Sequence, residues 1–518
     1  MACFFSTAIF DIVVTAMKRK KLARRRLGGK KRHGFFWPGN LMLKLQQSLI
    51  ALQDRSFQGR IPSKPPRPKL LKPVITSSLQ QQSSHLCPPV SQSVAEVVFG
   101  DGHSGLRRSS LYPLTKRRSE GAVPIAANYR LIDVVVSNCI NSNITKIYAL
   151  TQFNSTSLNT HLTKAYSEIG LGKDGFVQAI AAYQSPENQG WFQGNADAVR
   201  RCLWVLEEYP VMDFLILPGH HLYEMDYRAL VGAHRKAGCY ISVVALSADG
   251  AHDRNPALGT LRINSQKRVL GIDSNEVKIT GKSETAGCNN HLISTRIYLI
   301  KRNVLVELLR ERFPGENWIE GVIRGAISLG MEVEAYLFDG YWGDTGSIGA
   351  FYWANMENTT KPDARFDFYD RDSPVYTVAR SLAPSIISGS VITGSLIGDG
   401  CILNRCNIKG SVVGMRTRVD DGATVEDSVI MGSDTYEWDN HTDPVNGKRS
   451  AAVPPLGIGA NTHIRRSIVD KNPRIGKNVL LINRDNVREG DREADGYMIS
   501  DGIIVVLRNA VIPDGTDL

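Results

Sequence analysis

A six-residue spacing of aliphatic residues in the last third of the chain constrains its fold more than any other feature. Four such residues follow one another at steps of six: Val413, Val419, Val425 and Met431. The same step separates Ile397 from Leu403, Ile458 from Ile464, and Ile475 from Leu481. Short strands that each point one aliphatic residue inward at this spacing form a parallel β-helix, with three strands to a coil. A Val- and Gly-rich β-sandwich, the alternative, would not keep a six-residue phase. We therefore predict a β-helix over residues 373–518, with residues 433–457 as a loop inserted between coils.

Before this repeat, residues 91–372 alternate short apolar strands with amphipathic helices. The expected strands include AEVVF (95–99), KIYAL (146–150), DFLILP (213–218) and ISVVAL (241–246). In NADAVRRCLWVLEEY (195–209), one side of a helix carries Ala198, Cys202, Leu203 and Leu206. This alternation predicts an α/β domain with a mostly parallel sheet and helices on both faces. Ligands bind such sheets at the carboxyl ends of the strands, so we expect a site at the turns after Phe99, Leu217 and Phe338.

The positive charge of the chain is confined to its first part. The net charge is +11, and the first 95 residues hold 17 Lys and Arg but only two acidic residues, Asp11 and Asp54. The remainder holds 45 basic and 49 acidic residues. Because the folded part is slightly acidic, we expect no nucleic-acid partner for it.

Residues 1–90 have the composition of a leader. The stretch from Met42 to Ser93 is rich in Ser, Gln, Pro and basic residues and almost free of acid, which favours an organelle transit peptide. The basic run between residues 17 and 32 also fits a nuclear signal or a solvated tail, and Met42 is an alternative start. The apolar stretch from Cys3 to Met17 is short and interrupted by Asp11, so we expect no membrane span.

The eight cysteines include no CxxC pair. The spacing of Cys401 and Cys406 suits neither a zinc site nor a redox dithiol, which favours scattered reduced thiols. Cys87 differs, because it stands in a Ser- and Pro-rich stretch before the first predicted strand, where an exposed thiol could bridge to another subunit.

The segment VVFGDGHSGLRRSSLYPLTKRR (97–118) has the order of a phosphate-binding element. An apolar strand leads into a glycine-bearing loop and then into a cluster of positive charge. Such loops present backbone amides to a phosphate. The loop is unusual, however, because it holds a His, an Asp and two Arg where a phosphate cradle favours glycine.

Several motifs together carry a resemblance to one family. They are LYPLTKRR, AVPIAANYRLIDVVVSNCINSNITKIYALTQFNSTSLNTHL, WFQGNADAVR, GHHLYEMDY, YWGDTGSI and IVDKNPRIGKN. They resemble plant ADP-glucose pyrophosphorylases (glucose-1-phosphate adenylyltransferases) of the small-subunit type, from about Cys87 to Leu518. The resemblance implies a nucleotidyltransferase α/β domain followed by a left-handed β-helix. It also implies a plastid enzyme of starch biosynthesis that converts ATP and glucose 1-phosphate to ADP-glucose and pyrophosphate.

That reaction depends on positioning phosphates and neutralising their charge. It calls for a glycine loop, a lysine and Mg²⁺ held by carboxylates. By resemblance, Asp344 is a retained Mg²⁺ ligand. The resemblance further implies nucleotide contacts at Gly100, Gly102, Gly194, Ala196 and Asp197, and glucose-phosphate contacts at Gly259 and Ser294. For Asp197 the alternative is a first-turn acid that the helix dipole favours.

Other positions depart from the family pattern where charge must be neutralised. The loop that corresponds to the family sequence GGGAGTRL is four residues longer in this chain. The family arginine of this loop falls on Ser110, and Arg107 or Arg108 could take its place. The family lysine of KPAVP falls on Glu120, and the Mg²⁺-binding aspartate of GDH falls on His220. Further departures fall on Asn275, Arg296, Gly321 and Gly343. Mg²⁺ prefers hard oxygen ligands to imidazole, and loss of one transition-state contact typically costs roughly 10²–10³ in rate. We therefore predict a weakened Mg²⁺ site and impaired catalysis.

The family's effector positions are retained. Family enzymes bind phosphorylated metabolites between their two domains, and the matching cations are Arg117, Arg118, Arg130, Arg466, Lys471 and Arg508. Arg508 replaces a lysine, and its guanidinium suits phosphate. The alternative is a solvated basic rim. The resemblance also implies a heterotetramer of large and small subunits, in which Cys87 pairs two small subunits.

Three hypotheses follow from these patterns. The first is an active adenylyltransferase that uses compensating residues in its longer loop. The second is a weak or inactive subunit that modulates catalytic partners. The third is a nucleotide-sugar binder that uses another base. The departures concentrate where charge must be neutralised, whereas the effector positions are spared. This distribution favours family membership with impaired catalysis.

Overall fold

The computed structural model describes residues 88–100, 109, 111–183, 190–247, 259–273, 291–357, 359, 366–437 and 453–518, without the side chains of His291 and Asp344. Most of the predicted leader and Cys87 therefore lie outside the described residues. So do Gly102, both arginines at 107 and 108, Ser110 and Asn275.

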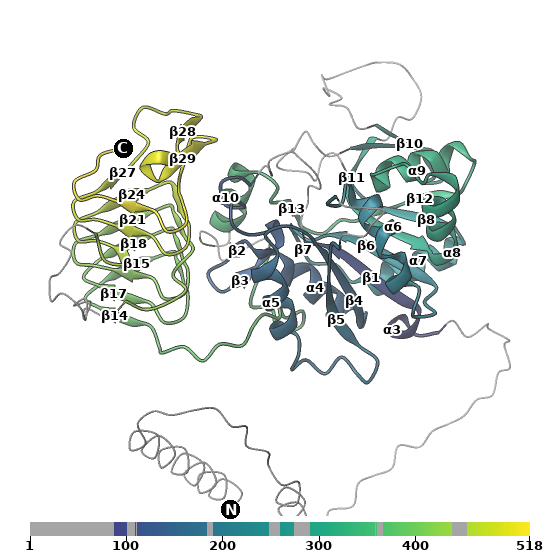
Figure 1. Ribbon diagram of the computed structural model, residues 1–518, viewed down its shortest axis with the longest axis horizontal. Coiled ribbons are helices and arrows are strands. Elements are labelled where there is room, and N and C mark those ends of the chain that lie inside the picture. The colour runs from purple at the N-terminus through teal and green to yellow at the C-terminus, as the bar shows by residue number, and fades with distance from the viewer. Residues whose placement is uncertain are drawn as a thin grey trace, which may run out of the picture. The chain divides into compact units, whose positions relative to one another are not determined.

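A nine-stranded sheet forms the centre of the first domain (Figure 1). Its main path runs β10-β9-β11-β6-β1-β4-β5, with β8 paired to β11 and β12 paired to β8. The strands β1, β4, β5 and β6 are parallel, whereas β11 is antiparallel to both β6 and β8, so the sheet is mixed but mostly parallel. The bounds are β1 (Val94–Phe99), β4 (Lys146–Thr151), β5 (Phe176–Ala181), β6 (Asp213–Pro218), β8 (Ile241–Ser247), β9 (Thr260–Ile263), β10 (Val269–Asp273), β11 (His291–Lys301) and β12 (Val333–Leu337).

Helices cover both faces of this sheet, as the strand–helix alternation predicts. Alternate residues of β1 serve the two faces: Val97 packs in one buried cluster and Val98 in the other. The first cluster contains α6 (Asn195–Leu206), α8 (Arg302–Glu307), the π-helical η2 (Leu308–Arg312) and α9 (Ile319–Ser328). The second contains α4 (Leu131–Asn141), α5 (Thr156–Ala165) and α7 (Tyr227–Ala237). Two cores therefore enclose the sheet, and every residue of the strands β1, β4 and β6 is buried.

The C-terminal domain is the predicted parallel β-helix, and its stacked coils form three sheets (Figure 1). The first holds β14 (Ile386–Ser388), β17 (Ile402–Asn404), β20 (Arg418–Val419), β23 (Gly457–Ile458), β26 (Arg474–Ile475) and β31 (Val511–Ile512). The second holds β15 (Val391–Thr393), β18 (Asn407–Lys409), β21 (Thr424–Glu426), β24 (His463–Arg465) and β27 (Leu480–Leu481). The third holds β16 (Leu396–Ile397), β19 (Val412–Val413), β22 (Val429–Ile430), β25 (Ser467–Val469), β30 (Ile503–Val506), β29 (Tyr497–Ser500) and β28 (Gly490–Arg492).

The aliphatic residues of the six-residue repeat stack inside the coils. Val419 pairs with Ile458, Ile458 with Ile475, and Ile475 with Ile512, and all four are buried. The hexapeptide phase in the sequence therefore marks the interior of the β-helix.

Two coils of the β-helix are longer than the others. Stacked partners such as Leu403 and Val419 stand 16 residues apart, whereas Val419 and Ile458 stand 39 apart. The sequence predicted this first extension, which joins β22 to β23, and residues 438–452 within it lie outside the described residues. A second extension, which the sequence did not reveal, follows β27 and contains the antiparallel pair β28–β29 with the 3₁₀ turn η3 (Glu493–Asp495).

A shared apolar cluster joins the sheet domain to the β-helix. It includes Leu111 and Leu114 from the turn after the glycine loop, and Phe351 from α10 (Ile348–Met356). From the β-helix it includes Val429 and Ile468, among others. The turn that leaves the predicted phosphate loop thus packs directly on the second domain.

In the part of the chain that the structure describes, no helix has the length and apolarity needed to cross a bilayer. The described cysteines, Cys139, Cys202, Cys239, Cys401 and Cys406, are all free and buried, in keeping with the predicted reduced thiols.

Candidate active site

Three glycines bring the carboxyl ends of β1 and β6 together. The amide of Gly121 donates to the carbonyl of Gly100 at 2.9 Å, and the amide of Gly219 donates to the carbonyl of Phe99 at 3.0 Å. A Cβ atom at Gly219 would stand 2.3 Å from the Phe99 carbonyl oxygen, so no larger residue fits there without movement of the backbone. These backbone contacts lie at the carboxyl ends of β1 and β6, where we predicted a nucleotide site.

Glu120 and His220 face one another across this frame. Glu120 begins the 3₁₀ turn η1 (Glu120–Ala122), and His220 follows the end of β6. His220 Nδ1 lies 3.8 Å from Glu120 Oε2, and both side chains are 5% exposed. The hydroxyl of Ser109, the last described residue before Leu111, donates to Glu120 Oε1. The two departures from the family pattern thus form one buried acid–imidazole pair.

The strand pair β7 (His221–Tyr223) and β13 (Trp342–Asp344) borders this site. Asp344 is in register with His221, and the hydroxyl of Thr345 donates to the carbonyl of His220. Burial, together with the neighbouring His220 and Arg296, holds the pKa of His221 well below its usual value, so this imidazole is neutral. The structure therefore places the backbone of Asp344 beside the Glu120–His220 pair.

This donor set fits Mg²⁺ poorly. Glu120 brings a carboxylate, but His220 brings a nitrogen where the family has oxygen. Among the described residues, no three His, Cys, Asp or Glu side chains are grouped so that they could hold a metal ion. A metal at this site would depend on Asp344, whose side chain lies outside the described set.

The N-terminus of α6 carries the residues predicted to contact the nucleotide, but these residues make hydrogen bonds and ion pairs within the protein. Gly194 packs so closely on the segment before α9 that a Cβ atom would stand 1.9 Å from the Asn317 carbonyl oxygen. That carbonyl accepts from the Ala196 amide at 3.0 Å. Asp197 accepts from the Gln193 amide at 3.0 Å and pairs with Arg200 at 3.4 Å. The alternative of a helix-terminal structural acid therefore has direct support, and a nucleotide role for Asp197 stays a prediction.

Residues of the predicted glucose-phosphate site lie on β11 and beside it. Ser294 is buried, and its amide donates to the Gly259 carbonyl at 2.9 Å, which joins the two predicted residues. Arg296, where the family has glycine, has φ = +62° within an irregularity of the β11–β8 pairing. A non-glycine residue there costs about 1–2 kcal/mol. Its guanidinium pairs with Glu320 at 3.1 Å, so the added charge is balanced locally.

Comparison with known proteins identifies the family. Residues 104–361 match the nucleotidyl transferase family, and residues 380–516 match the GLGC left-handed parallel beta-helix domain. The inactive glucose-1-phosphate adenylyltransferase small subunit 2, chloroplastic, of Arabidopsis thaliana is 55% identical over 446 residues, which cover 84% of this chain and 90% of that protein. The chain belongs to the glucose-1-phosphate adenylyltransferase family. The small subunit, chloroplastic/amyloplastic, of Triticum aestivum is 45% identical over 484 residues, covering 90% of this chain and 99% of that protein.

Four of the six cations that we predicted at effector positions lie where the two domains meet. Arg118 is buried and pairs with Asp470, while its Nε donates to the Leu114 carbonyl at 3.1 Å. Asp434 binds both Lys471, at 2.7 Å, and Arg508, at 2.8 Å. These two cations depress the pKa of Asp434 against the opposing effect of its burial. Four separate segments of the chain thus meet in one charged cluster.

This cluster is crowded with positive charge. Burial, aided by Arg118 and Arg380, lowers the pKa of Arg130 to about 10 despite the nearby carboxylate of Asp133. Burial and the neighbours Arg130 and Arg118 also lower the pKa of Lys471. Desolvated cations that repel one another gain from a bound anion. The two remaining predicted cations, Arg117 and Arg466, are exposed.

Sequence reasoning missed the acidic partners of these cations. Asp434, Asp470 and Glu493 contact predicted effector residues or line the adjoining pocket. Lys471 and Arg508 stand 37 residues apart, the same separation as the stacked pair Val469 and Val506. Stacking of the coils therefore brings these two cations close together, but the sequence of the second extension holds no aliphatic repeat from which this register could have been counted.

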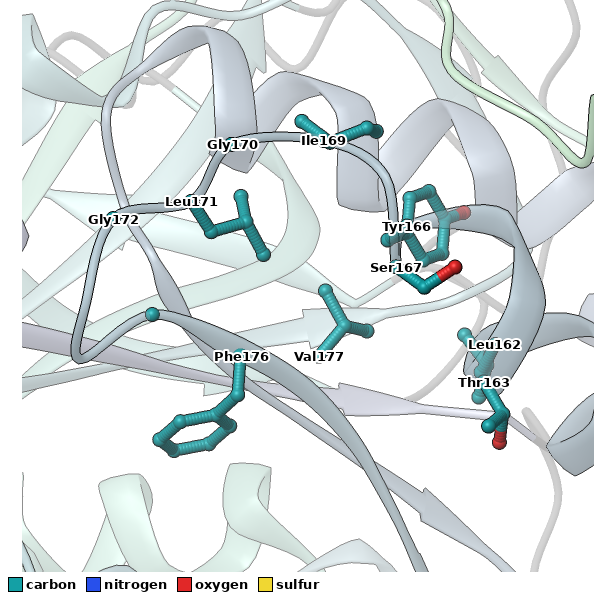
Figure 2. A pocket seen from close by; sticks show the side chains of 11 residues that line it. Leu162, Thr163, Tyr166, Ser167, Ile169, Gly170, Leu171, Gly172, Phe176 and Val177 are labelled. Carbon is teal, nitrogen blue, oxygen red and sulfur yellow. The ribbon is translucent and has the colours of Figure 1, made fainter. Parts of the chain in front are cut away.

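A separate cavity of about 430 Å³ lies at the sheet edge, between α5 and β5 (Figure 2). Leu171, Phe176 and Val177 line it with Tyr166 and other residues of the intervening loop. None of the predicted site residues lines this cavity, so it is distinct from the candidate active site.

Proposed function

We propose that this chain is a plastid small-subunit member of the adenylyltransferase family that has lost most of its catalytic power and keeps a role in assembly and regulation. The family reaction transfers the adenylyl group of ATP to glucose 1-phosphate and releases pyrophosphate. The single observation that carries this proposal is the buried contact between Glu120 and His220.

The chemistry of the contact explains the loss. A triphosphate at the ends of β1 and β6 needs cations and a metal to offset its charge. Glu120 instead brings a carboxylate that is already engaged by Ser109 and faces His220. Like charges repel strongly at a buried site, so Glu120 opposes phosphate binding. Nucleotidyl transferases of this family generally use Mg²⁺, and Asp344 is the residue that we propose would hold it.

The remaining predicted substrate contacts support binding more than chemistry. We propose that Gly100 and Gly102 lie next to the nucleotide, together with Gly194, Ala196 and Asp197. Glucose 1-phosphate would lie beside Gly259 and Ser294. In this proposal these glycine, alanine, serine and aspartate residues orient ligands, while Ser110, Glu120 and His220 no longer supply the charge that the transition state needs.

The assembly role rests on the relatives and on the intact junction between the domains. Both named relatives are small subunits and both are chloroplastic proteins, one of them also amyloplastic. We propose a large-subunit partner in a heterotetramer and a transit peptide within residues 1–90. We further propose phosphorylated effectors at Arg117, Arg118, Arg130, Arg466, Lys471 and Arg508. The predicted bridge through Cys87 is part of the same proposal.

Pyrophosphate release from ATP and glucose 1-phosphate tests the loss of catalysis. We expect the purified chain with Mg²⁺ to turn over at least about 10²-fold more slowly than the wheat relative measured in parallel, as for loss of one preorganised contact. Equal turnover would favour the second candidate, an active enzyme that uses the arginines of its longer loop. Assembly is tested separately, by co-expression with a large subunit and size-exclusion chromatography.

A further inference from the structure

One carboxylate of the β-helix domain contacts two residues of the turn that leaves the glycine loop. Glu493, in the extension between β27 and β30, accepts a hydrogen bond from the hydroxyl of Tyr112. The same carboxylate pairs with the Lys116 ammonium at 2.5 Å and raises the pKa of that lysine. These contacts span more than 370 residues of sequence, so they exist only because the two domains pack together.

A pocket of about 170 Å³ adjoins this contact. Four cations line it, Lys116, Arg117, Arg118 and Arg508, against two carboxylates, Asp470 and Glu493. The excess of cations suits an anion, and a phosphoryl group offers several acceptor oxygens to them. The carboxylate of Glu493 already pairs with one of these cations, Lys116, so an anion that enters the pocket meets a competing negative charge.

We propose that Glu493 is a built-in competitor for the phosphorylated ligand of this pocket, and that ligand binding releases Tyr112 and Lys116 from Glu493, while the Arg118–Asp470 pair keeps the rest of the turn on the β-helix. Two like charges beside Lys116 repel, so the ligand displaces the Glu493 carboxylate from Lys116 and from the Tyr112 hydroxyl. This inference rests on the proposed effector role of the cation cluster. It adds Glu493 as the residue that sets the affinity of this pocket for its phosphorylated ligand.

The release of Tyr112 would transmit the event to the candidate active site. Next to Tyr112, the Leu111 amide donates to the Ser109 hydroxyl oxygen at 3.1 Å, and that hydroxyl donates to Glu120. A change at Tyr112 therefore reaches Glu120 through its neighbour Leu111 and two hydrogen bonds.

Calorimetric titration of the full chain with inorganic phosphate tests the proposal. Glu493→Gln removes the competing charge, and we expect it to tighten phosphate binding at least about fivefold, the lower range of measured coupling between sites. Asp495→Asn is the matched control, because Asp495 is an exposed acid in the same short turn and lines no part of the pocket. We expect it to change affinity less than about twofold, as for a screened surface charge. Equal effects of the two variants, or no effect of Glu493→Gln, would overturn the proposal.

Two further variants separate this inference from the proposed effector site. Arg508→Met removes a lining cation, and weaker phosphate binding is expected if the pocket is the effector site. If Arg508→Met leaves binding unchanged, the effector site is wrong and the competitor role falls with it. If Arg508→Met weakens binding but Glu493→Gln does not tighten it, only the competitor role is wrong. Tyr112→Phe weakens the hold on Glu493 without changing charge, so tighter phosphate binding is expected there too, which keeps the test valid if Glu493→Gln fails to fold.

Discussion

Charged residues meet at two places in this protein, and they are balanced differently. At the ends of β1 and β6, one acid faces one imidazole, with a third group, the Ser109 hydroxyl, bound to the acid. Where the sheet domain meets the β-helix, cations outnumber acids, and several of them are desolvated. The acid of the first site has a hydroxyl and an imidazole beside it, whereas the second site holds an excess of cations that an anion would relieve.

The loss of catalysis that we propose leaves the structure intact at both places. The positions that we align with the family's lysine and aspartate carry Glu120 and His220, and these two side chains lie close together in a buried site. A buried carboxylate without any partner would instead cost several kcal/mol. In our proposal this exchange of residues preserves local packing while it removes the electrostatic conditions for binding a triphosphate.

The substitution with the largest expected effect weakens the contact between the two domains. Asp470→Asn leaves the buried guanidinium of Arg118 without its carboxylate, and we expect the free energy of unfolding to fall by about 3–5 kcal/mol. Urea denaturation followed by circular dichroism measures this. The control is Asp421→Asn, which breaks an exposed pair with Arg405 and is expected to cost about 0–1 kcal/mol. Similar losses in both variants would mean that the junction is no stronger than a surface contact.

Restoring the family charges at the first site should recover chemistry. Glu120→Lys combined with His220→Asp supplies an ammonium for phosphate and an oxygen ligand for Mg²⁺. We expect the rate of pyrophosphate release to rise by roughly 10²–10³. A properly folded double variant with the rate of the parent chain would show that the longer loop, not the charge pair, limits the reaction.

The same two substitutions test whether the reversed pair is a structural unit. Either change alone leaves two like or unmatched groups in a buried site, so each should lower the free energy of unfolding. Together they restore opposite charges. We expect the double variant to be more stable than the sum of the single effects predicts, by about 0.5–3 kcal/mol. Strict additivity in thermal or urea unfolding would show that Glu120 and His220 do not interact.

The smallest effect concerns the pH dependence of the junction. The pKa of Asp434 is lowered in the folded protein, so its contribution to stability is complete above the ordinary aspartate pKa, near 4. That contribution is lost as the pH falls below 4 towards the folded value. We expect Asp434→Asn to lower the free energy of unfolding by about 1 kcal/mol at pH 7, since Asp434 is 40% exposed and partly screened. The difference between variant and parent should shrink between pH 4 and pH 3, and a constant difference would contradict the assignment.

The sequence predicted the architecture because each domain has its own period. Aliphatic residues at steps of six give the β-helix, and alternating strands and helices give the mixed sheet. Short-range patterns cannot show contacts between distant segments, and for this reason the pairing of Glu120 with His220 was not foreseen. The second extension was also missed, because residues 482–500 hold no aliphatic repeat that could mark its limits. The positive φ of Arg296 arises at an irregularity in the pairing of β11 with β8, and the amino-acid sequence around Arg296 does not predict it.

The stacked column from Val419 to Ile512 has a consequence for how such a chain can change over time. Its members stay aligned although the chain between them varies from 17 to 39 residues. Residues inserted at a corner between two strands therefore leave the packing of the buried aliphatic column unchanged. A corner of the β-helix can gain a new segment without a compensating mutation among the buried residues. Glu493 and the hairpin that carries it stand in one such addition, so a lineage could gain or discard this contact as a single module.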